Sequence, residues 1–307
     1  QSANQPISQS ANRPASQAAN QPTSQAVNQA IRQPATKIKP SASSASRLSG
    51  TGPNTGWISV NLKGRALISK KRANKIGFSE PGTNEPSVRI WAVSDVHTDF
   101  PGNKARIQSL DAAKYSHDIL ILAGDVSNKL NEIADTLREC RERFARVFFV
   151  PGNHDLWLTL PEKRQGVADS IEKLKSILSI CSELGVDTAP AEVVVGPRRV
   201  LIVPILSWHH PQWDTEPDIE GWDGVLPVEK VVSDYMLTSW PDTIKIADGS
   251  AARAVDNLND EVFDMDSLLE RRKACDAVIS FSHFLPRVEL NPEKRYLSAA
   301  NLAKAIG

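Results

Sequence analysis

Short apolar runs alternate with amphipathic stretches along residues 87–307. Runs typical of buried strands lie at 88–93, 118–123, 146–150, 191–195, 199–206 and 277–281. Apolar residues recur at helical spacing at 104–112, 129–144, 167–184 and 258–273. Strands that alternate with helices predict an α/β domain in which helices cover the faces of the sheet.

One connection breaks this alternation. The segment from Gly196 to Arg199 separates two predicted strands and is too short for a helix. Its Gly-Pro sequence indicates a hairpin turn. We therefore expect part of the sheet to be antiparallel, in a mixed sheet or in a sandwich of two sheets.

The N-terminal part has a different composition. Residues 1–40 repeat a polar, proline-containing unit with a period of eight, and we expect disorder because few apolar side chains could offset the entropy of ordering. The predicted organisation is a disordered basic tail at 1–55, a linker or ordered arm at 56–86 and a folded domain at 87–307. The tail resembles an organelle transit peptide but begins with Gln, so an organellar and another intracellular location both stay open.

Charge and cysteine content narrow the classes of protein. The 36 basic and 36 acidic residues balance, but residues 1–79 contain no Asp or Glu, so the predicted domain is acidic. An acidic domain disfavours nucleic acid as a partner. No apolar run reaches the length of a membrane span. Cys140 and Cys181 continue helical apolar series, so we expect buried core thiols.

Polar side chains follow three of the apolar runs. The predicted strands run into Ser94-Asp95-Val96-His97, into Gly124-Asp125-Val126-Ser127-Asn128 and into Gly152-Asn153-His154-Asp155. In open α/β sheets, ligands bind beyond the carboxyl ends of the strands. The three segments therefore predict a metal site at one edge of the sheet.

The residue types suggest a chemistry for this site. Asp95 and His97 are two residues apart, so in an extended chain their side chains would lie on one side and bind one cation. The carboxylate of Asp125 can bridge two cations, and Asn153 offers a neutral oxygen, which leaves His154 free to act as an acid. Mixed nitrogen and oxygen ligands suit Mn, Fe or Zn better than Ca. Two such ions promote phosphoester hydrolysis.

The segments DVH, GDVSN, GNHD and Ser282-His283-Phe284 together resemble the calcineurin-like metallophosphoesterase superfamily. The resemblance implies a four-layer β-sandwich flanked by helices, with a dinuclear centre at the strand ends. It implies that Asp95 and His97 bind the first metal, that Asp125 bridges, and that Asn153 and His283 bind the second. His154 would then contact phosphate and protonate the leaving group, and Asp155 would orient the imidazole of His154.

Two departures from the family pattern change what we expect of the site residues and of the activity. Asn128 stands where the family often has a second Asp, so we assign it a supporting or substrate-binding role. The final family motif, Gly-His-x-His, is absent, since no histidine follows His283. We expect a C-terminally incomplete domain, and a fragment of low activity that needs further residues.

A tryptophan-rich segment follows the predicted strand at 199–206. It contains Trp208, His209 and Trp213, which either form a lid that contacts the substrate or seal a small satellite core. The sequence does not choose between these two interpretations.

The preferred hypothesis is a hydrolase that cleaves phosphate esters by attack of a metal-bound hydroxide at a centre of two Mn, Fe or Zn ions. The alternative is a non-catalytic relative that keeps the fold and binds a protein partner. A nuclease is disfavoured by the acidic domain. The sequence does not distinguish phosphomonoester, phosphodiester and phosphoprotein substrates, nor does it give the oligomeric state.

Overall fold

The computed structural model describes residues 58–60, 88–222, 228–297, 304, 306 and 307. The predicted N-terminal tail and most of the predicted linker lie outside the described residues. All described residues belong to one compact unit, Gly52–Gly307.

The first sheet has the strand order β1-β2-β3-β4 among the described residues. Its strands are β1 (Ile58–Val60), β2 (Ile90–Val93), β3 (Ile119–Ala123) and β4 (Arg146–Val150). β1 pairs with β2 in antiparallel fashion, whereas β2, β3 and β4 run parallel. The three parallel strands therefore end at one edge, as predicted.

The second sheet contains β5 (Ala191–Val195), β6 (Arg198–Pro204) and β7 (Ala277–Phe281), in that order. β5 and β6 are antiparallel, and the turn between them contains Gly196 at φ +60°. The predicted hairpin is confirmed. β7 runs parallel to β6, so it brings a further strand end from late in the chain.

The described helices are α2 (Pro101–Gln108), α3 (Ala112–Tyr115), α4 (Leu130–Arg143), α5 (Leu160–Arg164), α6 (Ser170–Leu184), α7 (Val228–Val231), α8 (Asp234–Leu237), α9 (Ser250–Val262) and α10 (Met265–Lys273). Two predicted helices, at 104–112 and 258–273, are each divided in two. Asp111 and Asp264 lie at the divisions, and their carboxylates accept hydrogen bonds from amides of the next helix. Such N-caps start a new helix.

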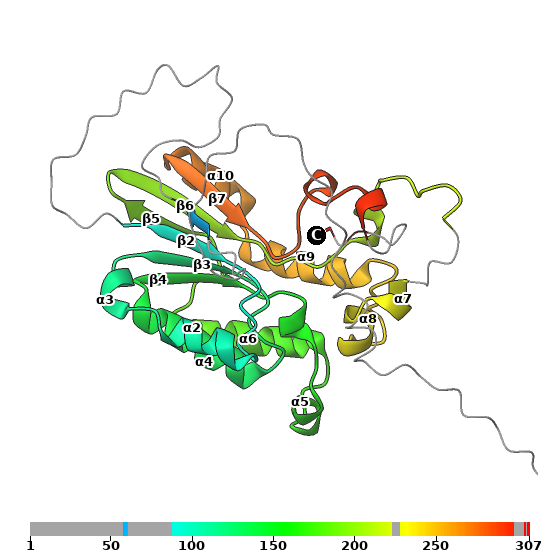
Figure 1. Cartoon of the computed structure of the whole chain (residues 1–307). Coiled ribbons are helices and arrows are strands. Elements are labelled where there is room, and N and C mark those ends of the chain that lie inside the picture. The colour runs from blue at the N-terminus through cyan, green and yellow to red at the C-terminus, as the bar shows by residue number, and fades with distance from the viewer. Residues whose placement is uncertain (1–57, 61–87, 223–227, 298–303, 305) are drawn as a thin grey trace, which may run out of the picture. The chain divides into compact units, whose positions relative to one another are not determined.

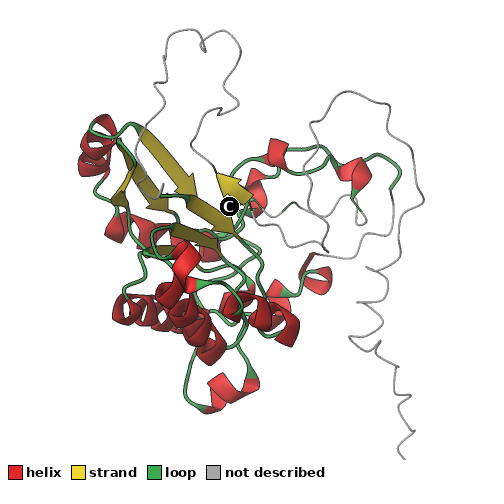
Figure 2. Cartoon of the chain, turned by 60° about the vertical axis from the view of Figure 1, so that its left-hand side comes forward, coloured by secondary structure: helices red, strands yellow, loops and turns green. Residues whose placement is uncertain are grey.

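The alternation of side chains along the strands separates two cores. Ile119 and Ile121 of β3 face the second sheet, whereas Leu120 and Leu122 face the helices. Helices α4 and α6 cover the outer face of the first sheet, and the second sheet lies on its other face (Figures 1 and 2). The predicted mixed α/β sandwich of two sheets flanked by helices is confirmed.

Both predicted core thiols lie on helices that cover the first sheet, Cys140 on α4 and Cys181 on α6. Cys140 and Cys181 are fully buried against the first sheet, and burial raises the pKa of each thiol to about 12. Within the described part of the chain, no helix is long and apolar enough to cross a membrane.

Candidate metal centre

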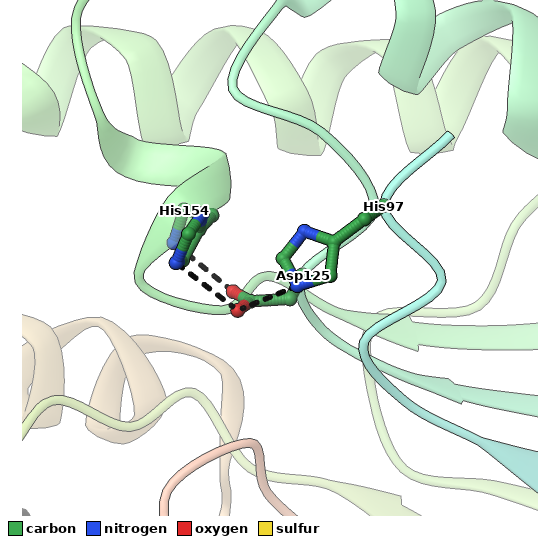
Figure 3. A group of neighbouring side chains, drawn as sticks. All are labelled: His97, Asp125 and His154. Atoms are coloured by element: carbon green, nitrogen blue, oxygen red, sulfur yellow. Dashed lines mark hydrogen bonds and ion pairs between the residues drawn. The ribbon is translucent and has the colours of Figure 1, made fainter. Parts of the chain in front are cut away.

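Four strand ends bring polar side chains together around Asp125. His97 follows β2, Asp125 follows β3, His154 follows β4 and His283 follows β7. The Nε2 atoms of His97 and His154 each lie 3.8 Å from Oδ2 of Asp125, and Nε2 of His283 lies 3.4 Å from Oδ1. Figure 3 shows His97 and His154 on either side of the carboxylate. Ligand atoms of His97, Asp125 and His154 all lie within 4.8 Å of one another.

The backbone at these strand ends is unusual. Asp95, His97 and Asp125 have φ angles of +55°, +41° and +56°, in the left-handed region that residues other than glycine rarely adopt. Backbone hydrogen bonds between the loops hold them there: the amide of Asp95 donates to the oxygen of Gly124, and that of His97 to the oxygen of Asp125. Strained backbone of this kind gathers at functional sites.

This turn corrects one sequence prediction. The spacing of Asp95 and His97 predicts an extended strand end, but the strand stops at Val93 and the chain turns left-handed at both residues. His97 reaches the cluster, whereas the exposed Asp95 accepts a hydrogen bond from the hydroxyl of Ser94 and lies outside the group of three.

Two glycines permit the close approach of the loops. A Cβ added at Gly124, which has φ +84°, would lie 2.5 Å from Nδ1 of His283, and one at Gly152 would collide with the carboxylate of Asp125. Any side chain there would therefore displace the polar groups of the cluster.

The atoms around His283 show how well the residues fit a cation. Nδ1 of His283 lies 2.9 Å from the carbonyl oxygen of Ala123, which can only accept, so Nδ1 carries the proton and Nε2 of a neutral ring has the lone pair. This Nε2 faces Oδ1 of Asn153 at 2.9 Å and Oδ1 of Asp125 at 3.4 Å. Three acceptors that meet at one point favour a shared cation, and nitrogen and oxygen donors suit Mn, Fe or Zn.

The electrostatics agree with a cation site. Burial raises the pKa of Asp125 to about 7, the hydrogen bond from the His154 amide lowers it, and the nearby carboxylates of Asp95 and Asp234 raise it. Burial, and after it the neighbouring His97, lower the pKa of His154 to about 4. The pocket thus combines crowded carboxylates with the neutral imidazole of His154, and a bound cation would relieve the repulsion between the acids.

Asp155 has a different role from the predicted one. It is fully buried, and its two oxygens accept hydrogen bonds from the backbone amides of Asp125, Val126, Ser127 and Gly152. These four donors occupy both oxygens, so the prediction that Asp155 orients the imidazole of His154 is wrong. Asp155 instead fixes the loop after β3 against the loop after β4.

Asn128 lies at the back of the same loops. Its backbone oxygen accepts a hydrogen bond from Nζ of Lys173 at 2.8 Å, and its side-chain Oδ1 is buried with no hydrogen-bond partner among the described residues. The supporting position is consistent with the sequence-based assignment, and a substrate contact of Asn128 stays a prediction.

The tryptophan-rich segment divides between core and surface. Trp208 is 1% exposed and packs on Trp240 and Phe284, and His209 is 6% exposed beside Trp208. Of the two interpretations, the core applies to Trp208 and His209, because their rings are buried. Trp213 is 47% exposed and stacks on His210 at 4.0 Å, so its contact with substrate stays a prediction.

Two residues beside the cluster were not predicted. Trp157 stacks on the imidazole of His154 with ring centroids 3.6 Å apart. Asp234 is buried and accepts hydrogen bonds from the side chains of Asn153 and Trp157. The position of Trp157 two residues after GNHD could have pointed to it, whereas Asp234 lies far along the chain with no motif around it.

The fold and the donor set define an α/β protein with a candidate cation site at the edge of a parallel sheet. The family model of the calcineurin-like phosphoesterases matches residues 88–287, more than half of the chain. The chain therefore belongs to the calcineurin-like phosphoesterase family, and the resemblance seen in the sequence is confirmed.

A curated relative and two solved structures resemble the chain. The [acyl-carrier-protein] phosphodiesterase PptH of Mycobacterium tuberculosis is 40% identical over 99 residues, which are 32% of this chain and 30% of PptH. The crystal structure of phosphopantetheinyl hydrolase (PptH) from M. tuberculosis matches with a TM-score of 0.44 and 29% identity, over 64% of this chain and 68% of that one. A protein of unknown function from Aquifex aeolicus, AQ665, matches with a TM-score of 0.21 and 18% identity, over 44% of this chain and 66% of that one.

Proposed function

We propose that the chain is a metal-dependent phosphoesterase. The observation that carries this proposal is the convergence of three imidazole nitrogens, from the ends of three strands, on the Asp125 carboxylate at the end of a fourth, at 3.4 to 3.8 Å. Membership of the calcineurin-like family supports the same chemistry.

The residues of the cluster would have distinct roles in metal and phosphate binding. Asp125 would bridge two cations, His97 and Asp95 would hold the first, and Asn153 and His283 would hold the second. Bound there, divalent cations lower the pKa of water and stabilise the negative charge of a phosphoryl group. His154 is half-buried, lies between His97 and Trp157, and would donate a hydrogen bond to a phosphate oxygen.

The fixed loops would position the ester. Asp155 and the strained backbone hold Asp125 in place before any ligand arrives, so little reorganisation is needed when charge develops on the phosphate.

The substrate class we propose is a phosphodiester. The M. tuberculosis relative is named an acyl-carrier-protein phosphodiesterase, and its matched stretch covers 30% of its length. We therefore propose phosphopantetheinyl acyl carrier protein as the first natural substrate to test.

The test compares the wild type with Asp125→Asn. The wild type, loaded with Mn²⁺, is expected to hydrolyse bis-p-nitrophenyl phosphate at a low but measurable rate, and Asp125→Asn to lose at least about 100-fold in turnover together with bound Mn²⁺, because even indirect changes at a metal site cost about 10–100-fold. Metal content by elemental analysis and nitrophenol release provide the two readouts. Full turnover and full metal content in Asp125→Asn would sink the assignment.

Three substrates extend the test. Release of phosphopantetheine from holo acyl carrier protein is compared with hydrolysis of bis-p-nitrophenyl phosphate and of the monoester p-nitrophenyl phosphate. Cleavage of the two diesters over the monoester supports the proposed class. Metal binding without hydrolysis of any of the three would favour the non-catalytic scaffold.

A further inference from the structure

The buried carboxylate of Asp234 connects two residues of the site. Asp234 is the first residue of α8 and is 4% exposed. Its Oδ1 accepts a hydrogen bond from Nδ2 of Asn153 at 2.8 Å and from Nε1 of Trp157 at 2.7 Å. One oxygen thus holds a proposed metal ligand and the ring that stacks on His154.

The first bond decides which atom of Asn153 faces the cluster. Because the NH₂ group donates to Asp234, Oδ1 points the other way, toward Nε2 of His283. A flipped amide would place the Asn153 oxygen against the Asp234 carboxylate, two acceptors with no proton between them. Asp234 therefore keeps the oxygen, which can bind a cation, on the side of the site.

The second bond fixes the ring beside His154. Nε1 of Trp157 has its donor satisfied by Asp234, and the indole lies at 29° to the His154 imidazole with centroids 3.6 Å apart. Without this bond the indole would lose the contact that orients it, and the imidazole would lose one wall of its pocket.

Asp234 itself is rigidly held. The amide of Leu158 donates to the oxygen of Leu237 at 2.8 Å, and the amide of Ser170 donates to the oxygen of Ser239 at 2.6 Å. These bonds dock the segment that carries Asp234 on the segment that follows the Gly-Asn-His-Asp loop. The carboxylate can therefore transmit a fixed position to Asn153.

We propose that Asp234 is a positioning residue of the metal centre, which orients the amide of Asn153 toward the cation and the indole of Trp157 against His154. The inference rests on the proposed function, since it requires that Asn153 faces a bound cation. It adds a residue that lies outside every motif of the sequence.

The test measures Mn²⁺ affinity by calorimetry in the wild type, Asp234→Ala, Asp234→Asn and Trp157→Phe. We expect Asp234→Ala to weaken Mn²⁺ binding by about 10–100-fold, the range found for groups that orient metal ligands. Asp234→Asn keeps an acceptor oxygen and is expected to retain more affinity than Asp234→Ala. Trp157→Phe removes the bond to Trp157 but keeps the Asn153 bond, so its Mn²⁺ affinity should stay near that of the wild type.

Kinetics and a control separate positioning from folding. With bis-p-nitrophenyl phosphate, kcat should fall more than KM rises in Asp234→Ala. Met236→Ala changes an exposed residue of the same helix and should match the wild type in affinity and kcat. If Asp234→Ala fails to fold, as judged by circular dichroism, the difference in Mn²⁺ affinity and kcat between Asp234→Asn and the wild type tests the role of Asp234.

The outcomes are distinguishable. A wild type that binds no Mn²⁺ overturns the proposed function together with this inference. Mn²⁺ binding by the wild type with unchanged affinity and kcat in Asp234→Ala, or in a folded Asp234→Asn when Asp234→Ala is unfolded, overturns the role of Asp234 alone.

Discussion

At the scale of single residues, the site depends on the absence of side chains as much as on their presence. Gly124 precedes Asp125 and leaves space for the imidazole of His283, which comes from the second sheet. Ring and backbone approach so closely there that even a methyl group would move one of them. The small residue therefore decides whether His283 can face Asp125.

We predict that Gly124→Ala weakens Mn²⁺ binding by at least about 10-fold, because the added Cβ would lie 2.5 Å from Nδ1 of His283. Calorimetric titration with Mn²⁺ measures the effect. Gly166→Ala is the matched control: Gly166 also has a positive φ, +98°, but a Cβ there meets nothing within 4 Å. Equal losses of affinity in both variants would assign the effect to backbone strain rather than to contact with His283.

At the scale of the elements, a buried ion pair holds the site loops on α6. Lys173 of α6 is fully buried, and its Nζ lies 3.1 Å from the Glu162 carboxylate of α5. The same Nζ donates to the backbone oxygens of Asn128 and Trp157, which belong to the loops after β3 and β4. Glu162 in turn accepts hydrogen bonds from the amides of Leu130 and Thr159.

We predict that Lys173→Met lowers the free energy of unfolding by about 3–5 kcal/mol, because it leaves the Glu162 carboxylate buried without its partner. Urea denaturation measures the loss. In the double variant Glu162→Gln/Lys173→Met the loss should be smaller than the sum of the two single losses, since no unpaired charge remains.

The control for this pair is Lys104→Met. Lys104 forms an ion pair with Glu132 at 2.7 Å, but both side chains are partly exposed, so little stability should change. Strictly additive losses for Glu162 and Lys173 would contradict the coupling.

At the scale of the whole molecule, the candidate metal centre takes residues from both sheets. His97, Asp125 and Asn153 follow strands of the first sheet, whereas His283 follows β7 of the second. A cation held by residues of both sheets would bind the folded state and not the unfolded chain, so it should raise the thermal stability of the domain.

We predict that Mn²⁺ at 100 times its Kd stabilises the wild type by about 2.7 kcal/mol. For a domain of this size the corresponding rise in Tm is about 5–10 °C. Differential scanning calorimetry with Mn²⁺ and with EDTA measures it. His283→Ala should show a smaller rise at the same Mn²⁺ concentration, because the second sheet no longer contributes a ligand.

His117→Ala serves as the control, since His117 is exposed and lies on the turn before β3. Its rise in Tm should equal that of the wild type. An equal rise in His283→Ala would mean that the cation binds the first sheet alone.

The sequence by itself determined the strands, the hairpin at Gly196, the family and most of the cluster around Asp125. Strand signals are local, and the carboxyl ends of parallel strands must meet, so the sequence alone places Asp125, Asn153 and His154 together. Helix capping also depends on local sequence. However, the apolar periodicity continues through Asp111 and Asp264 and so predicts an unbroken helix at both positions. An Asp inside a periodic stretch is not enough to identify an N-cap from the sequence.

Only the tertiary structure decided what surrounds the cluster. Asp155 is next to His154 in the chain, yet its two carboxylate oxygens accept hydrogen bonds from four backbone amides of the loops after β3 and β4. Trp208 lies in a segment that could equally form a lid, but the packing of Trp240 and Phe284 against it buries its ring. Asp234 reaches Asn153 across 81 positions of sequence. Such contacts depend on how separate elements pack, and no spacing within one segment encodes them.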